Sequence, residues 1–351
     1  MSWQGIEGHD SVVDRFRRAL ARGRLASSFL FVGPPGVGKF AFAIKLAQSL
    51  LCERNPEAAL EPCGQCAGCV QVTARSHPDL IIVKKPPDKS EIPLALLIGS
   101  KEKRMREGLI YDISLRPARG RRKIAIIDDA DDLNEEGANC LLKTLEEPPP
   151  GSVLILLGTN LQAQLPTIRS RCQMMRFDPL PAPIIERLVL EQGIAPDAAS
   201  AQQIASFCEG SLQRARESSE PALWEFRRSL LARLATGDFD ERELTDEVEA
   251  FVKEAVTEAP PRRLRLKQVV GFFEDFFFQT HRAAAGCVAE GDEALRQAVA
   301  QSQRAKGWPS LTAARGIERC EQALWQVDAN ANQGTLIAAF LDDLAQIIRQ
   351  R

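Results

Sequence analysis

The stretch GPPGVGKF, residues 33–40, constrains this chain more than any other feature. Its first seven residues follow the pattern of a phosphate-binding loop, in which backbone N–H groups and a lysine hold phosphate oxygens. The eighth residue breaks the pattern. Phe40 stands where a serine or threonine hydroxyl binds the Mg²⁺ of a nucleotide. The loop therefore predicts a phosphate-binding fold whose metal chemistry is in question.

The residues on either side of the loop predict the context that it requires. SSFLFVG, residues 27–33, is a short apolar run typical of a buried strand, and FAFAIKLAQSLLC, residues 40–52, has helical spacing. A strand, a glycine-rich loop and a helix N-terminus together form a phosphate cradle. Its predicted binding residues are Gly33, Gly36, Gly38 and Lys39. A plain glycine-rich turn is the alternative for the loop taken alone.

Three further apolar runs predict strands at residues 79–84, 123–131 and 152–160. Helical patterns lie between them, for example at residues 134–147. Buried strands that alternate with helices predict a parallel sheet with helices on both faces. The fold class is therefore expected to be α/β in this part of the chain.

No strand is expected beyond the proline-rich residues 177–183, where the remaining patterns are helical. We therefore expect three domains: an α/β domain of nucleotide-binding type at residues 1–178, a small all-α domain at 179–240 and a second all-α domain at 241–351. The acidic stretch at residues 238–249 fits either a linker or a helix.

Polar residues at the ends of two predicted strands are candidates for the nucleotide site. Asp128 is expected at the carboxyl end of its strand, beside the loop, where it would hold Mg²⁺ through water. Asp129 occupies the position of a glutamate that orients the attacking water, and is one methylene shorter. Asn160, after the next strand, could contact the terminal phosphate or the water. Solvated acids and an ordinary turn are the alternatives.

Three arginines are candidates for contacts with a nucleotide. PTIRSRC, residues 166–172, places Arg169 and Arg171 beyond the edge of the sheet, where a guanidinium can reach the nucleotide of a neighbouring subunit. EGSLQRA, residues 209–215, begins a helix that would aim Arg214 back at the site. A surface salt bridge is the alternative for a single arginine.

Four of the nine cysteines follow the spacing C-x10-C-x2-C-x2-C, at Cys52, Cys63, Cys66 and Cys69. Thiolates two residues apart can wrap one tetrahedral ion, and four thiolates without histidine favour a closed, structural Zn²⁺ site. Disulfides in an oxidising compartment or an iron–sulfur cluster are the alternatives. The other five cysteines are expected to be small apolar residues.

The composition narrows the class of protein. The 351 residues carry a formal net charge of −2, so any contact with DNA would need a local basic face. No apolar run approaches the roughly 20 residues that span a bilayer, and the N-terminal residues lack the apolar core of a signal peptide. We expect a cytoplasmic protein without a membrane partner.

Five segments together resemble the bacterial replication clamp loader, whose subunits are AAA+ proteins of the DNA polymerase III holoenzyme. They are GPPGVGK, the cysteine spacing, SHPDL at residues 76–80, ANCLLKTLEEPPP at 138–150 and PTIRSRC. The resemblance extends from about residue 5 to about residue 215, and residues 329–340 are similar to the last helices of the family's collar. It implies an AAA+ domain with a zinc module at residues 52–69, then a lid domain and an oligomerising collar domain.

The resemblance also implies roles for individual residues. The family's motor subunit, gamma/tau, has a complete loop and an Asp–Glu pair, whereas its delta-prime subunit commonly has a degraded loop and keeps the arginine of the SRC motif. Phe40, Asp129 and the lack of a long extension after the collar resemble delta-prime. Arg171 would then be an arginine finger that acts in trans, and the chain itself would hydrolyse little or no ATP.

Two other functions stay open at this point. The chain could be an active gamma/tau-type ATPase with an unusual loop, or a zinc-containing DNA-binding module outside replication, although the latter explains neither LLKTLEEPP nor the collar-like segment. The partners that the resemblance implies are gamma/tau-type and delta-type subunits, the sliding clamp and primer–template DNA. The implied cofactors are structural Zn²⁺ and, at a vestigial nucleotide site, ATP with Mg²⁺.

Overall fold

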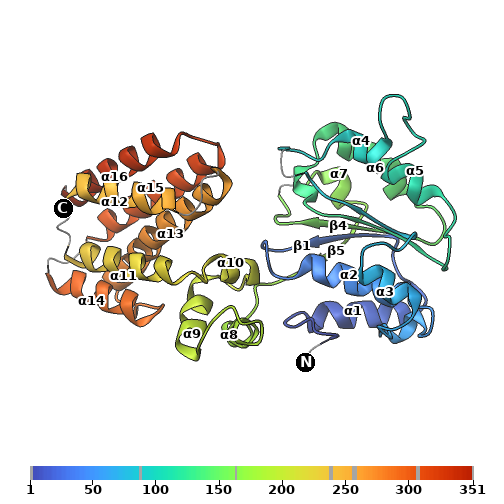
Figure 1. Ribbon diagram of the computed structural model, residues 1–351, viewed down its shortest axis with the longest axis horizontal. Coiled ribbons are helices and arrows are strands. Elements are labelled where there is room, and N and C mark those ends of the chain that lie inside the picture. Colours follow the sequence, from blue (N-terminus) through green and yellow to red (C-terminus); the bar gives the residue numbers. More distant parts are fainter. Residues whose placement is uncertain are drawn as a thin grey trace. The chain divides into compact units, whose positions relative to one another are not determined.

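Figure 1 shows the computed structural model of the chain, which describes residues 3–86, 89–162, 164–236, 240–254, 259–305 and 309–349. The chain forms two compact units. The first contains residues 1–193 and 208–215, and the second contains residues 194–207 and 216–351. Each unit has hydrophobic clusters of its own.

The first unit is built around a five-stranded parallel sheet with the strand order β2-β3-β4-β1-β5. The strands are β1 (Ser28–Val32), β2 (Leu80–Val83), β3 (Lys123–Ile127), β4 (Ser152–Gly158) and β5 (Gln173–Arg176). Because parallel strands all end at the same edge, the segments that follow β1, β3 and β4 gather there. This edge carries the phosphate-binding loop.

Successive side chains along β1 enter two different cores, as the pleat of a strand requires. Phe29 and Phe31 pack in a cluster with α1 (Asp10–Ala21) and α2 (Lys39–Leu50). Leu30 and Val32 pack on the other face with α4 (Leu94–Ile98), α5 (Leu109–Ser114) and α6 (Glu135–Glu146). The predicted parallel sheet with helices on both faces is therefore confirmed (Figure 1).

The shorter elements of the first unit lie around these layers. They are the 3-10 turn η1 (Glu57–Ala59), α3 (Ala67–Thr73), the 3-10 turn η2 (Ala130–Asp132), α7 (Pro166–Arg169), α8 (Ala182–Glu191) and α10 (Leu212–Glu217), whose last two residues belong to the second unit. Gln48 of α2 joins α3 to the sheet domain, because its amide donates to the carbonyl oxygen of Cys69 (3.1 Å) and to Oγ1 of Thr73 (2.9 Å).

The second unit is all helical in the part that the structure describes. Its helices are α9 (Ala198–Phe207), α11 (Pro221–Thr236), α12 (Glu241–Glu254), α13 (Ala259–Ala284), α14 (Glu293–Ala305), α15 (Ser310–Asp328) and α16 (Gln333–Arg349). Gly316 lets α15 approach α13 closely, since a Cβ there would lie 2.6 Å from the ring of Phe277. Among the described residues, no helix combines the length and the apolar composition that a membrane crossing requires.

Two features differ from the sequence patterns. The strand β5 was not predicted, because its sequence QMMR buries only Met175 and it lies at the edge of the sheet next to β1. The range predicted for a lid domain, residues 179–240, divides between the units, so the three-domain scheme stays a prediction. Of the acidic stretch, residues 241–249 lie in α12, while Asp238 and Phe239 are outside the described residues.

Candidate functional site

The phosphate-binding loop lies between β1 and α2 and depends on its glycines. Gly36 (φ +76°) and Gly38 (φ +102°) adopt the left-handed region, where other residues are strained. A Cβ on Gly33 would lie only 2.1 Å from the carbonyl oxygen of Phe177. The helix α2 begins at Lys39, so its free N–H groups face the loop, as anion binding requires.

The loop lysine is buried against its own loop. Nζ of Lys39 donates to the carbonyl oxygens of Gly33 (2.5 Å) and Pro34 (2.7 Å). Burial lowers the pKa of Lys39, and the negative charges of Asp131 and Asp128 oppose that shift. A phosphate in the loop would give this buried cation an anionic partner.

Phe40 occupies the position of the usual metal-binding hydroxyl and directs its ring into an apolar environment. The half-buried ring packs against the hydrophobic cluster of the α1–α2 face. The guanidinium of Arg75, just beyond α3, lies 5.1 Å from the ring centroid, a cation–π contact. The side chain therefore offers no oxygen to a Mg²⁺ ion at this position.

The acids after β3 lie at the same edge of the sheet as the loop, with β4 between β3 and β1. The charge of Asp128 acts on Lys39 of the loop, so its predicted role at a nucleotide stays a prediction. Asp128 forms an ion pair with Nζ of Lys84 (3.2 Å). Asp129 has a left-handed backbone (φ +56°), and burial, with the charge of Asp128, raises its pKa.

A third acid, Asp131, connects the turns after β3 and β4. Its carboxylate accepts hydrogen bonds from the backbone N–H (2.5 Å) and Oγ1 (2.7 Å) of Thr159, and from the amide of Gln164. Asn160 is exposed and accepts a bond from the N–H of Gln162 (2.9 Å). Sequence reasoning missed Asp131, because nothing in the run DDADD shows which acid turns toward β4.

Residues 208–215 close over the loop within the first unit. The N–H of Leu212 donates to the carbonyl oxygen of Gly36 (3.1 Å), and a Cβ on Gly36 would lie 2.2 Å from Oγ of Ser211. The start of α10 therefore contacts the loop, and the predicted role of Arg214 at a nucleotide stays a prediction. The guanidinium of Arg214, however, pairs with the carboxylate of Glu209.

His9 is a further residue of the site that sequence reasoning missed. It is buried, and its Nε2 forms a hydrogen bond with the carbonyl oxygen of Val37 in the loop (2.7 Å). Its ring meets Phe177 edge-on at 4.8 Å between centroids. Burial lowers the pKa of His9, and the bond to Val37 partly opposes the shift. A single histidine before a helix carries no sequence signal for this contact.

Arg171 follows α7 and is held by a residue of the LLKTLEEPP segment. Its Nε (2.7 Å) and Nη2 (2.5 Å) both approach Oε1 of Glu146. Its Nη1 donates to the carbonyl oxygen of Thr167 (2.9 Å) and to Oγ of Ser170 (3.1 Å). About a third of the Arg171 side chain is exposed, and the nearby Arg169 is also exposed.

The four predicted cysteines converge. Their sulfur atoms all lie within 4.8 Å of one another, with 4.0 Å between Cys52 and Cys66 and 3.9 Å between Cys63 and Cys69. A tetrahedral ion with bonds of about 2.3 Å requires sulfur atoms roughly 3.8 Å apart. The group can therefore hold a metal ion, and its spacing is too wide for S–S bonds.

Backbone N–H groups point at these sulfur atoms in the manner that stabilises thiolates. The N–H of Cys66 donates to Sγ of Cys63, and the N–H of Cys69 donates to Sγ of Cys66, each at 3.3 Å. Bonds from Gln65 and Cys66 hold the pKa of Cys63 below its ordinary value, whereas burial raises the pKa of Cys69. Metal binding would favour the thiolate form of all four.

The parallel sheet and the glycine-rich loop between β1 and α2 define a protein of the P-loop class, whose loop lacks a metal-binding hydroxyl. The family described as "DNA polymerase III, delta subunit" matches residues 8–181. The chain belongs to this family of DNA polymerase III clamp-loader subunits.

Individual relatives extend the comparison. The chain is 34% identical over 200 residues to "DNA polymerase III subunit delta'" of Bacillus subtilis (strain 168), covering 57% of this chain and 56% of the relative. It is 36% identical over 160 residues to the Pseudomonas aeruginosa protein of the same name, covering 46% and 45%. It is 33% identical over 222 residues to "DNA polymerase III subunit tau" of Escherichia coli (strain K12), covering 62% and 32%. The chain thus spans about half or less of these relatives' lengths.

Proposed function

We propose that this chain is a delta-prime-like subunit of the replicative clamp loader that does not act as a motor. It would help to load the sliding clamp onto primed DNA, and would offer Arg171 to the ATP of a neighbouring subunit. Its natural partners would be gamma/tau-type and delta-type subunits, the clamp and primer–template DNA, in the cytoplasm. The lid and collar domains that the resemblance implies would carry the assembly.

The observation that carries this proposal is the environment of Phe40. The ring lies among apolar side chains and under the guanidinium of Arg75, so no side-chain oxygen is available at the metal position. In phosphoryl transfer the metal's charge matters most in the transition state. The missing ligand should therefore impair hydrolysis more than nucleotide binding.

Weak nucleotide binding remains compatible with this function. The glycines of the loop have the geometry of a phosphate cradle, and Lys39 is in place beneath it. Asp128 is available near the loop, although it pairs with Lys84. We propose that ATP binds here weakly, with Gly33, Gly36, Gly38 and Lys39 contacting the phosphates.

The Arg171 environment supports a role in trans. Its guanidinium is fixed by Glu146, Thr167 and Ser170, yet remains partly exposed. These contacts use Nε–H, both N–H groups of Nη1 and one of Nη2, so the second N–H of Nη2 is left to donate to an external phosphate oxygen. An oriented and accessible guanidinium is what an arginine finger requires.

A gamma/tau-type motor is the second candidate, and one observation favours it. The E. coli tau protein is about as similar to this chain as the delta-prime relatives are. Phe40 and Asp129 argue against a motor, because they replace the metal ligand and shorten the acid that would orient water.

We further propose that the four cysteines hold a structural Zn²⁺ ion. The sulfur spacing matches a tetrahedral site, and four thiolates leave no open position for a substrate. The module would fix the segment between α2 and α3 together with the start of α3, and Arg75, just beyond α3, reaches Phe40.

Two measurements on purified protein test the assignment. Size-exclusion chromatography should show that the chain forms a complex with separately purified gamma/tau-type and delta-type subunits. The chain alone should show little Mg-dependent ATP hydrolysis, whereas the complex should hydrolyse ATP when clamp and primed DNA are added. Vigorous turnover by the isolated chain would favour the motor assignment.

A further inference from the structure

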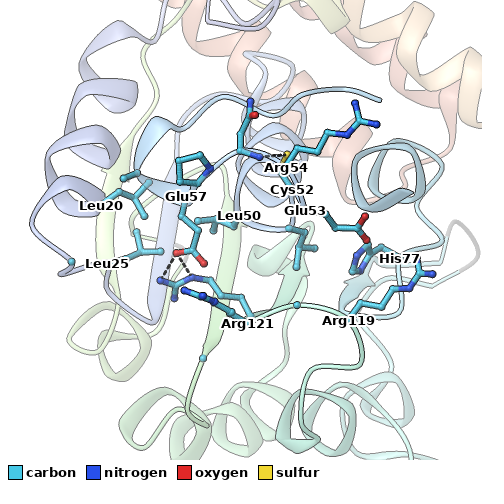
Figure 2. Close-up of a pocket in the computed structure, with 18 residues that line it drawn as sticks. Leu20, Leu25, Leu50, Cys52, Glu53, Arg54, Glu57, His77, Arg119 and Arg121 are labelled. Carbon is cyan, nitrogen blue, oxygen red and sulfur yellow. Dashed lines mark hydrogen bonds and ion pairs between the residues drawn. The ribbon is translucent and has the colours of Figure 1, made fainter. Parts of the chain in front are cut away.

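A second pocket lies at the edge of the sheet opposite the phosphate-binding loop, with a volume of about 840 Å³ (Figure 2). Its walls include residues 119–122, just before β3, Gly151, just before β4, and His77, shortly before β2. These residues precede the N-terminal ends of parallel strands, whereas the phosphate-binding loop follows the C-terminal end of β1. The pocket is therefore separate from the nucleotide site.

The pocket combines a cationic wall with an apolar one. Four arginines and two glutamates line it, which gives a formal charge of +2. Figure 2 shows Arg119 and Arg121 along the lower wall and the side chains of Leu20 and Leu25 at the left. Clefts lined by one sign of charge concentrate ligands of the opposite sign.

The arginines differ in how far their charges are already neutralised. Nη2 of Arg122 pairs with Oε2 of Glu57 at 2.8 Å, which leaves little charge for a ligand. The guanidinium of Arg119 donates to the neutral amide oxygen of Gln71 (3.1 Å) and has no ion-pair partner in the part of the chain that the structure describes. Arg121 is exposed and has no ion-pair partner among the described residues. Arg119 and Arg121 therefore carry the available positive charge of this wall.

A buried carboxylate fixes the backbone of this wall. Asp79, from the SHPDL segment, is fully buried and accepts hydrogen bonds from the N–H groups of Ala118 (2.6 Å) and Arg119 (2.9 Å). Its own N–H donates to Nδ1 of His77 (3.0 Å). The backbone of Arg119 is thus positioned before any ligand arrives, and such preorganisation reduces the entropy lost on binding.

We propose that this pocket binds a phosphate group through Arg119 and Arg121, carried either by single-stranded nucleic acid or by a free polyphosphate. Guanidinium groups match phosphate oxygens in planar, paired geometry. The leucine wall would lie against an apolar part of the ligand. Cys52 of the cysteine module also lines the pocket, and a negatively charged sulfur there would oppose the binding of an anion. Binding of a phosphate group therefore depends on the positive charges of Arg119 and Arg121.

The test uses the full chain in a Lys39→Ala background, which removes the cation of the phosphate-binding loop. Binding of labelled oligo-dT is followed by fluorescence anisotropy at several salt concentrations, and binding of tripolyphosphate by calorimetry. Arg119→Glu combined with Arg121→Glu should weaken binding of both probes about tenfold or more. For oligo-dT, the slope of log K against log salt concentration should fall by the equivalent of roughly 1 to 2 phosphate contacts. Arg119→Gln with Arg121→Gln should give a smaller loss of the same kind.

Arg228→Glu is the matched control, because Arg228 is an exposed arginine on α11, outside the pocket. It should bind both probes as the Lys39→Ala protein does, and melting curves should show that every variant is folded. Binding of oligo-dT alone would assign the site to nucleic acid, and binding of tripolyphosphate alone would assign it to free polyphosphates. Binding that is absent, or that is unchanged by the changes at Arg119 and Arg121, would overturn the proposal.

Discussion

Arg171 and Glu146 form an ion pair in which Nε and Nη2 of the arginine share one carboxylate oxygen, at 2.7 and 2.5 Å. One residue comes from PTIRSRC and the other from LLKTLEEPP, so two motifs distant in the sequence meet at one guanidinium. About half of the Glu146 side chain is exposed. Exposed pairs of this kind contribute only ~0.2–1 kcal/mol to stability, so the pair's main effect is on the orientation of Arg171.

Glu146→Ala should therefore reduce activity more than stability. We expect slower ATP hydrolysis by the reconstituted loader, by a smaller factor than Arg171→Ala causes, and a change of less than about 1 kcal/mol in the free energy of unfolding. Glu146→Gln keeps an acceptor oxygen and should retain more of the rate.

The adjacent Glu147→Ala is the control, because Glu147 is exposed and is not bonded to Arg171. Adding Glu146→Ala to Arg171→Ala should cause no further loss, since a positioning residue acts only through the residue that it positions. An additive loss would show that Glu146 acts in another way.

Replacing one metal ligand should destabilise the cysteine module. Cys66→Ser should lower the metal content below one equivalent and reduce the free energy of unfolding by about 3 kcal/mol, or roughly 6–12 °C in melting temperature. Elemental analysis and thermal unfolding measure the two effects. Cys287→Ser, at an exposed cysteine of the second unit, should change neither. Wild-type protein with much less than one zinc ion per chain would contradict the site.

Restoring a hydroxyl at position 40 should affect binding more than turnover. Phe40→Thr should tighten binding of Mg-nucleotide by about tenfold, or ~1.4 kcal/mol, because the hydroxyl oxygen would become a ligand of the Mg²⁺ ion. Hydrolysis by the isolated chain should stay low, since Asp129 is still short and a partner's arginine is absent. Arg75→Ala removes the contact with the ring without adding an oxygen, and should leave nucleotide affinity unchanged.

Burial of His9 should make stability depend on pH. Its pKa in the folded state lies below the ordinary value of 6.5, so the unfolded chain binds more protons as the pH falls through the window between the two values. The contribution of neutral His9 to the free energy of unfolding is thus fully present above about pH 6.5. It declines below that pH, by at most ~1.4 kcal/mol per pH unit for one group. In urea unfolding at several pH values, His9→Gln should show a shallower decline. If the free energy of unfolding fell equally steeply with pH in the wild-type and His9→Gln proteins, His9 would not be the cause of the pH dependence.

Much of the fold could be predicted because burial on both faces leaves continuous apolar runs. KIAII and SVLILLG have no polar interruptions, and they became β3 and β4. The strand β5 has no such run, because its edge position leaves most of its side chains exposed. Strand order was harder to obtain, since local patterns do not specify that β4 separates β3 from β1.

In the candidate site, too, the features with a local sequence signal could be predicted and the contacts between distant segments could not. Glycine and cysteine spacings are local signals, and the cysteines predicted as ligands do converge. The contacts of Asp131 with Thr159, of His9 with Val37 and of Arg171 with Glu146 join segments 25 to 28 residues apart. Such pairs depend on how the strands are ordered and how helices pack on them, which no short pattern specifies.

Arg171 is central to the proposed function, in which it acts on ATP bound by a neighbouring subunit. The arginine fingers of small GTPases contribute about 10³ to 10⁵ in rate, but a ring with several such arginines should show a smaller effect from one of them. Arg171→Ala should leave the chain folded and able to assemble, because an exposed ion pair contributes little to stability. Arg171→Lys should not restore the rate, since an ammonium lacks the planar fork.

The most direct measurement is clamp- and DNA-stimulated ATP hydrolysis by loader reconstituted with wild-type or Arg171→Ala chain, with assembly verified by size-exclusion chromatography. Arg169→Ala, two residues away on the same exposed segment, is the matched control. We expect a slower rate with Arg171→Ala and an unchanged rate with Arg169→Ala. Equal rates for wild-type and Arg171→Ala loader would contradict a role for Arg171 in trans.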